Sequence, residues 1–137
     1  CAKSNEWVTA VAPGVIARSG EGVVILDLDG DGDEQTGWNV MYLHIESRDR
    51  VKAGTFVSAG DKIGHPSCEG GISTGTHTHI ARKFNGEWIL ADGPLPFNLS
   101  GYLAVNGDAP YLGTRVNGTE TIIADQRAAP RSNIHLP

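Results

Sequence analysis

The chain has 137 residues, of which 39% are hydrophobic and 7% aromatic, and this suits one compact domain of ordinary size. Its formal net charge is −5 and it has no long Lys/Arg cluster, so nothing resembles the basic surface of a nucleic-acid-binding protein. No apolar run approaches the roughly 18 residues of a membrane-spanning helix, and no signal peptide is visible. We therefore expect neither a nucleic-acid partner nor a membrane span.

The first third of the chain predicts short strands. Two β-branched stretches, Trp7 to Val11 and Val15 to Ala17, precede an apolar run over residues 23–28, with Gly and Pro between them. An acidic turn follows, and then the aromatic and β-branched segment WNVMYLHI over residues 38–45. These features predict a hairpin with a long acidic tip.

The rest of the chain continues the same pattern. Residues 51–64 read as brief strands joined at tight turns, and Asn85-Gly86 predicts a two-residue hairpin between strands because both residues tolerate positive φ. Asn117-Gly118 predicts a second hairpin, and the polar residues 126–137 read as a loose tail. We expect a mostly β fold without helices of normal length, in one domain over residues 1–125.

Two cysteines, Cys1 and Cys68, occur in the chain. An even number of cysteines in a small β domain allows one disulfide in an oxidising compartment. Free thiols are the alternative, and a lipid on Cys1 is a further one that no lipobox supports.

The segment STGTHTHI over residues 73–80 places His77 and His79 two positions apart at the head of a predicted strand. Side chains at i and i+2 share one face of a strand, with Cα atoms roughly 6.5 to 7 Å apart. The pair could bind one metal together, or one imidazole could bind it while the other acts on substrate. Two surface histidines remain the simpler interpretation of the spacing alone. His44 ends the segment MYLHI, and Tyr42 is expected on the same strand face as a structural aromatic.

Taken in order, these segments resemble the lysostaphin-type zinc endopeptidases of peptidoglycan, the family of LytM- and LasA-like peptidases. The resemblance rests on MYLHI, on VKAGTFVSAGDKIG over residues 51–64, and on CEGGISTGTHTHIARKFNGEW over residues 68–88. It covers roughly residues 7–90, and the last segment is similar to the LasA-like branch in particular.

The resemblance implies an antiparallel β-sheet core of β-sandwich-like form. It also implies a zinc-dependent endopeptidase that cleaves peptide cross-links of the cell wall, secreted or held in the cell envelope. It implies that His79 binds zinc and that His77 and His44 line the reaction centre. We expect His77 to act as general base and His44 to stabilise the oxyanion, although the two could exchange roles.

The chain also departs from the family pattern. The family's other two zinc ligands, a His and an Asp, come before the segment that matches WVTAVAPGVIARSG, and no histidine precedes His44 here. We expect an upstream segment to supply them, and the alternative is a non-catalytic member that binds wall peptides or regulates an amidase. A biotinyl- or phosphocarrier-like module is a further alternative because VKAGTFVSAGDKIG also resembles such turns.

The acidic segment DLDGDGDEQTGW carries carboxylates at alternate positions and Gly32 at the sixth, like the start of a calcium loop. Its twelfth residue is Trp38 rather than Glu. A solvated hairpin tip and a Ca²⁺ site are both open interpretations. The carboxylates concerned are Asp27, Asp29, Asp31 and Asp33. His65 and His135 are expected to be solvent-exposed.

Overall fold

The computed structural model describes residues 1–110 and 112–125, and these residues form strands and no helix. They divide into two compact units, Cys1–Ile89 and Leu90–Pro137. All strand pairs are antiparallel. The mostly β fold predicted from turn chemistry and the antiparallel sheet implied by the family resemblance are therefore confirmed. The described residues contain no helix able to cross a membrane.

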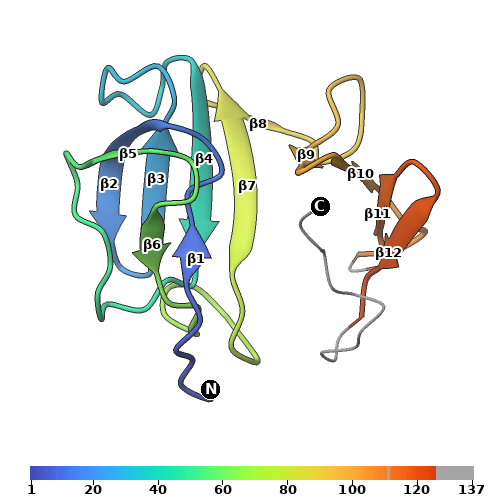
Figure 1. The fold of residues 1–137 in the computed structure, drawn as a ribbon, viewed down its shortest axis with the longest axis horizontal. Coiled ribbons are helices and arrows are strands. Elements are labelled where there is room, and N and C mark those ends of the chain that lie inside the picture. Colours follow the sequence, from blue (N-terminus) through green and yellow to red (C-terminus); the bar gives the residue numbers. More distant parts are fainter. Residues whose placement is uncertain (111, 126–137) are drawn as a thin grey trace. The chain divides into compact units, whose positions relative to one another are not determined.

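The first unit is built on a six-stranded sheet with strand order β5-β2-β3-β4-β7-β8 (Figure 1). A two-stranded ribbon, β1-β6, accompanies it. The strands are β1 (Val8–Thr9), β2 (Gly14–Gly20), β3 (Val23–Asp27), β4 (Trp38–Leu43), β5 (Phe56–Val57), β6 (Lys62–Gly64), β7 (His79–Phe84) and β8 (Glu87–Ile89).

The hydrophobic core lies on one face of this sheet, between the sheet and the β1-β6 ribbon. Alternate residues of β3 and β4 point into it, because successive side chains of a strand lie on opposite faces. The core residues are Ala10, Ile16, Val24, Leu26, Val40, Tyr42, Ile45, Val57 and Ile63.

The register of β4 against β7 decides which side chains face away from that core. Tyr42 pairs with Ile80 on the core face, and Leu43 pairs with His79 on the opposite face. In the neighbouring ladder Asp27 pairs with Asn39. Asn39 lies four residues before Leu43 on β4, an even number, so the side chains of Asn39, Asp27 and Leu43 lie on the same face of the sheet. The register thus places His79 outside the core.

Two hairpins test the turn predictions. Phe84 pairs with Glu87, so Asn85 and Gly86 form the predicted two-residue loop, with φ angles of 47° and 80°. In the second hairpin Asn117 is itself paired, with Glu120, so the loop is Gly118 and Thr119 instead. The predicted hairpin exists, but its turn is one residue further along the chain, because glycine takes the positive φ of 58° there.

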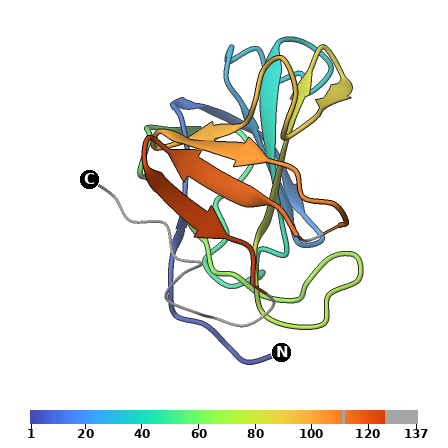
Figure 2. The same ribbon diagram turned by 90° about the vertical axis from the view of Figure 1, so that its right-hand side faces the viewer.

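The second unit contains a four-stranded sheet with strand order β12-β11-β10-β9, seen in orange and red in Figure 2. Its strands are β9 (Asn98–Leu99), β10 (Tyr102–Val105), β11 (Thr114–Asn117) and β12 (Glu120–Ile123). Tyr102 is buried and its hydroxyl donates a hydrogen bond to the Glu120 carboxylate at 2.6 Å. This bond connects β10 with β12 across the strand between them. The predicted tail, residues 126–137, lies outside the described residues.

Candidate active site

His44 follows β4 directly, at a point where the chain leaves the strand. Its φ is +68°, in the left-handed region that His, Asn and Asp enter more readily than most residues. The positive φ ends the alternation of side chains, so the expectation that Tyr42 and His44 share one face is wrong. Tyr42 is buried in the core, and its hydroxyl accepts a hydrogen bond from the Val11 amide at 2.9 Å. Tyr42 is therefore a structural residue, as expected.

The imidazole of His44 is held in a buried position, with 3% of its surface exposed. Its Nδ1 lies 3.0 Å from the carbonyl oxygen of Glu69. Because a carbonyl oxygen can only accept, this contact requires a hydrogen on Nδ1 and leaves Nε2 as the other functional nitrogen.

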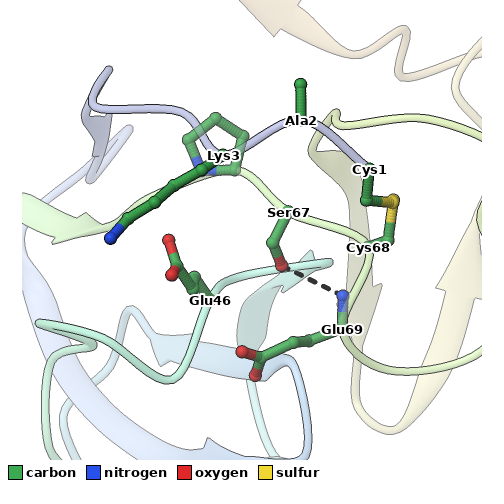
Figure 3. A pocket seen from close by; sticks show the side chains of 8 residues that line it. Cys1, Ala2, Lys3, Glu46, Ser67, Cys68 and Glu69 are labelled. Carbon is green, nitrogen blue, oxygen red and sulfur yellow. Dashed lines mark hydrogen bonds between the residues drawn. A yellow bond between two sulfur atoms is a disulfide. The ribbon is translucent and has the colours of Figure 1, made fainter.

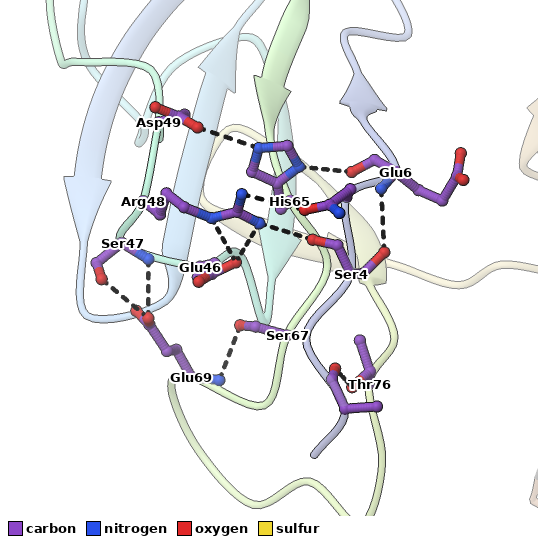
Figure 4. A network of polar contacts seen from close by, with 12 residues as sticks. Ser4, Glu6, Glu46, Ser47, Arg48, Asp49, His65, Ser67, Glu69 and Thr76 are labelled. Atoms are coloured by element: carbon purple, nitrogen blue, oxygen red, sulfur yellow. Dashed lines mark hydrogen bonds and ion pairs between the residues drawn. The ribbon is translucent and has the colours of Figure 1, made fainter.

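The loop that supplies this carbonyl is fixed by contacts on both sides, of which Figure 4 shows the contact with Ser47. The Glu69 carboxylate accepts hydrogen bonds from the amide and hydroxyl of Ser47 at 2.8 and 3.0 Å. On the other side, Gly22 and Gly70 touch so closely that a Cβ on Gly70 would lie 2.4 Å from the Glu21 carbonyl oxygen. Only glycine fits this approach, and the approach positions the Glu69 carbonyl beside His44.

His77 lies just before β7 rather than on it, which corrects the expectation that both histidines belong to one strand. The strand begins at His79, and His77 instead forms an isolated bridge with Ser67. Its Nδ1 lies 2.7 Å from the Gly75 carbonyl oxygen and 3.3 Å from the Ser73 hydroxyl. His77 therefore has the same arrangement as His44, with Nδ1 on a backbone carbonyl and Nε2 turned elsewhere.

Ser67 links the two histidines through the backbone. Its amide and its hydroxyl donate to the His44 carbonyl at 2.8 and 3.0 Å, and its own carbonyl accepts from the His77 amide at 3.3 Å. The sequence interpretation missed both Ser67 and Glu69. Glu69 lay inside the segment over residues 68–88 that carries the family resemblance, whereas no motif singled out Ser67.

The three histidines of the predicted site come together. The rings of His44 and His77 are 4.5 Å apart between centroids and tilted by 51°. His79 lies beside them with its side chain only partly exposed. The burial of the rest of the side chain, followed by the charges of His44 and His77, lowers the pKa of His79. A lowered pKa keeps the His79 imidazole neutral at physiological pH, which is the form that binds metal.

The donor chemistry of His79 fits zinc, which accepts imidazole nitrogen as a ligand. No hydrogen bond within the described residues occupies a ring nitrogen of His79, and its pKa is shifted by burial and charge rather than by such a bond. The histidines alone do not form a closed metal site, however. Among the described residues, only Asp27, Asp29 and Asp31 form a set of three or more such ligands within 4.8 Å of one another.

Cys1 and Cys68 form a disulfide, with Cα atoms 6.1 Å apart, as the even cysteine count allowed. The bond ties residue 1 to the loop that carries Ser67 and Glu69. A hollow of about 330 Å³ lies beside it, between the N-terminal segment and residues 66–69 (Figure 3). None of the three histidines lines this hollow, so their cluster faces a different part of the surface.

The acidic loop between β3 and β4 brings Asp27, Asp29 and Asp31 together and leaves Asp33 outside that set. A side-chain hydrogen bond with Asp27 raises the pKa of Asp29 above its ordinary value. The Asp33 carboxylate instead accepts a hydrogen bond from the Gln35 amide at 2.8 Å.

His65 is buried, with 3% of its surface exposed, so the expectation of a solvent residue is wrong. Its Nδ1 lies 2.7 Å from the Glu6 carbonyl and its Nε2 lies 3.3 Å from Asp49 (Figure 4). The ring of Trp7 also packs on the imidazole, with 4.0 Å between the ring centroids. The pairing of β1 with β6 draws the N-terminal segment over it. His135 lies outside the described residues.

Comparison with known proteins agrees with this geometry. The family model described as Peptidase family M23 matches residues 1–90, which is most of the chain. The chain therefore belongs to peptidase family M23.

Two relatives illustrate the similarity. Protease LasA of Pseudomonas aeruginosa is 31% identical over 94 residues, which are 64% of this chain and 22% of that protein. The matched region thus spans about a fifth of the relative's length. A solved structure titled as the novel M23 metalloprotease pseudoalterin from the deep sea shares the fold with a TM-score of 0.70 and 22% identity, covering 88% of this chain and 71% of that one.

Proposed function

We propose that this chain forms the catalytic core of a zinc-dependent endopeptidase that hydrolyses peptide cross-links of bacterial peptidoglycan. The observation that carries the proposal is the pairing of His44 with His77, each with Nδ1 on a backbone carbonyl, beside the exposed His79. Membership of a peptidase family and similarity to a protein named a protease support it.

In this proposal His79 is a zinc ligand, and the remaining ligands are a His and an Asp outside the histidine cluster. Zinc, when bound, supplies a Lewis acid and a water whose pKa is lowered toward about 7. The neutral His79 side chain presents a nitrogen lone pair for it without first losing a proton.

His77 is the proposed general base. Since its Nδ1 donates to the Gly75 carbonyl, the lone pair of the neutral ring is on Nε2, where it can accept a proton from an attacking water. His77 is exposed, so a peptide and its attacking water can reach that nitrogen.

His44 is the proposed oxyanion stabiliser. Its Nδ1 is occupied by Glu69, so it would donate to the developing oxyanion through Nε2 when the ring carries both hydrogens. Burial and the fixed loop around Glu69 hold the ring in place before substrate binds, which is what preorganised stabilisation requires.

We further propose that the protein acts outside the cytoplasm. A disulfide between Cys1 and Cys68 persists in oxidising compartments and is rare in the cytosol. Peptidoglycan, the proposed substrate, lies in such a compartment.

The experiment is digestion of purified peptidoglycan by this chain and by the full-length product of its gene, each with measured zinc content. We expect the zinc-loaded protein to release new amino groups, and fragment masses then identify the cleaved peptide bond. His77→Ala should retain zinc and lose this release. If folded, zinc-loaded protein binds peptidoglycan but releases no amino groups, the endopeptidase proposal is wrong and a binding role replaces it.

A further inference from the structure

The loop between β3 and β4 concentrates negative charge that its neighbours do not neutralise. One carboxylate oxygen each from Asp27, Asp29 and Asp31 lies within 4.8 Å of the others. Among the described residues, the ion pairs of this loop all involve Glu34, which contacts Arg18 at 2.9 Å and Lys83 at 3.9 Å. Asp27 is also completely buried, and a buried charge is costly unless it is paired or coordinates a metal.

A second observation concerns Asn39, which is 1% exposed. Its Oδ1 has no hydrogen-bond partner among the described residues, whereas its Nδ2 donates to the Thr36 carbonyl at 2.9 Å. The donation fixes which end of the amide is the oxygen. A buried acceptor left without a partner costs about 1–3 kcal/mol, so a missing partner is the natural explanation.

The position of Asn39 relates this oxygen to the carboxylates. Asn39 is the cross-strand partner of Asp27, so the two side chains leave the same face of the sheet with Cβ atoms about 5 Å apart. The amide lies against Thr36, whose hydroxyl donates in turn to the Asp31 carboxylate. The Asn39 side chain is therefore joined to the Asp31 carboxylate through Thr36 and is the cross-strand neighbour of Asp27, which puts its unpaired oxygen within reach of an ion held by these carboxylates.

Backbone amides donate to these carboxylates but leave acceptor positions on their oxygens free. Asp27 accepts the amides of Asp29 at 3.2 Å and Gly32 at 2.7 Å, one on each oxygen. Asp29 accepts one amide, that of Asp31, at 3.3 Å. Since an ionised carboxylate has about four lone-pair sites, each keeps acceptor capacity for a cation.

We propose that this loop binds one calcium ion through the carboxylates of Asp27, Asp29 and Asp31. The Oδ1 of Asn39 supplies a fourth oxygen. All four ligand atoms are oxygens, which suits a hard cation, and Ca²⁺ accepts six to eight oxygens in irregular geometry where Mg²⁺ demands a regular octahedron. Water completes the coordination.

The affinity should be moderate. The sequence spacing is that of an EF-hand loop, but Trp38 stands where that loop has its bidentate Glu, so one strong ligand is absent. We expect a dissociation constant of about 10⁻⁴ to 10⁻³ M, as in extracellular calcium modules.

The ion has a structural role. The loop enters β4 at Trp38, and His44 lies beyond the other end of that strand, about 20 Å away at the rise of an extended chain. Figure 1 shows this loop at the top of the view, at the opposite end of β4 from the chain that follows Leu43. Calcium here stabilises the β3–β4 hairpin and takes no part in peptide hydrolysis, so the inference does not depend on the proposed function.

Terbium luminescence tests the site, because Tb³⁺ occupies oxygen-rich calcium sites and Trp38, the residue that ends the loop, can sensitise it. The titration uses the whole chain with zinc held constant. We expect a saturable signal that Ca²⁺ displaces and that Mg²⁺ displaces far less effectively. The absence of any saturable, calcium-displaced signal below about 10 mM, an order above the expected range, overturns the proposal.

Two variants of equal charge provide the matched comparison. Asp29 and Asp33 are both exposed and each accepts one amide from the residue two positions on, but only Asp29 belongs to the converging set. Asp29→Asn should weaken calcium binding about tenfold or more, because affinity follows the number of charged ligands. Asp33→Asn should change it less than about twofold. Equal weakening in both variants indicates diffuse attraction of cations and overturns the site.

Asn39→Asp tests the fourth ligand. The added charge should destabilise the calcium-free protein and be offset by the ion, so the rise in melting temperature on calcium addition should exceed that of the wild type. A rise no larger than that of the wild type excludes Asn39 as a ligand.

Discussion

His44 and His77, which are 33 positions apart in the sequence, place their rings 4.5 Å apart with the same ring nitrogen on a backbone carbonyl. Among the residues that the structure describes, both rings are therefore oriented by backbone carbonyls rather than by a carboxylate partner. The two imidazoles differ in exposure, since His44 is buried and His77 is exposed, and this difference suits the two proposed roles of oxyanion stabiliser and general base.

Replacement of His44 should abolish most activity without loss of zinc. His44→Asn suits this test because Asn also tolerates the left-handed backbone at position 44. We expect hydrolysis to fall by about 10²–10⁴-fold, the usual contribution of such a group. The measurement is amino-group release per mole of folded protein, alongside zinc content.

His65 offers a matched control for that variant. It is as buried as His44, and its Nδ1 also contacts a backbone carbonyl, but it lies outside the histidine cluster. His65→Asn should lower stability and leave hydrolysis per folded molecule unchanged. If both variants lose activity equally, His44 acts through stability alone.

Zinc content should separate His79 from His77. His79→Ala removes a proposed ligand and should lower zinc occupancy strongly, whereas His77→Ala should keep it. Elemental analysis after dialysis against a fixed free zinc concentration gives the answer. Equal occupancy in the two variants would contradict the division of roles.

Reduction of the disulfide should destabilise the first unit. Cys1 and Cys68 are separated by 67 positions, and closing a loop of that length stabilises a fold by about 4 kcal/mol in the chain-entropy account. The check is urea unfolding with and without reductant. The double variant Cys1→Ser/Cys68→Ser serves as control, since reductant should leave its midpoint unchanged.

Tyr42 should ionise only at strongly alkaline pH. Burial raises its pKa to about 12, so its contribution to stability is complete below the ordinary value near 10 and is lost as the pH rises toward 12. Two pKa units correspond to about 3 kcal/mol, an upper figure for this loss. Tyrosinate absorbance and unfolding midpoints between these pH values provide the measurement.

Tyr42→Phe is the control for that titration. It should remove the late-ionising group and flatten this part of the stability profile. It should also cost about 1 kcal/mol at neutral pH, because the Val11 amide loses its partner. If the alkaline transition persists unchanged in this variant, another group causes it.

Local patterns predicted much of the fold. Asn85-Gly86 located a hairpin because both residues favour positive φ, and the alternation of β3 and β4 followed from their apolar and β-branched residues. The placement of His65 could not be predicted in this way, because its burial depends on β1 pairing with β6, a contact between distant segments.

The histidines of the candidate site could be selected from motifs, but their mutual arrangement could not. The positive φ at His44 turns its side chain away from the face that strand alternation predicts, and no local sequence pattern indicates this φ angle. Ser67 and Glu69 contact the histidines mainly through backbone atoms, which every residue has, and their side chains hold the loop through long-range contacts that no local pattern predicts.

The pairing of Leu43 with His79 makes the register of β7 against β4 as important for the site as the residues that β7 carries. A loss or gain of one residue between His79 and Phe84 changes the alternation within β7, so that His79 and Phe84 can no longer both keep their present faces, although every histidine stays in the sequence. Exchange of this strand between relatives is therefore safe only when the number of residues between paired positions is preserved. A chimera can retain the complete motif and still present it to the wrong side of the sheet.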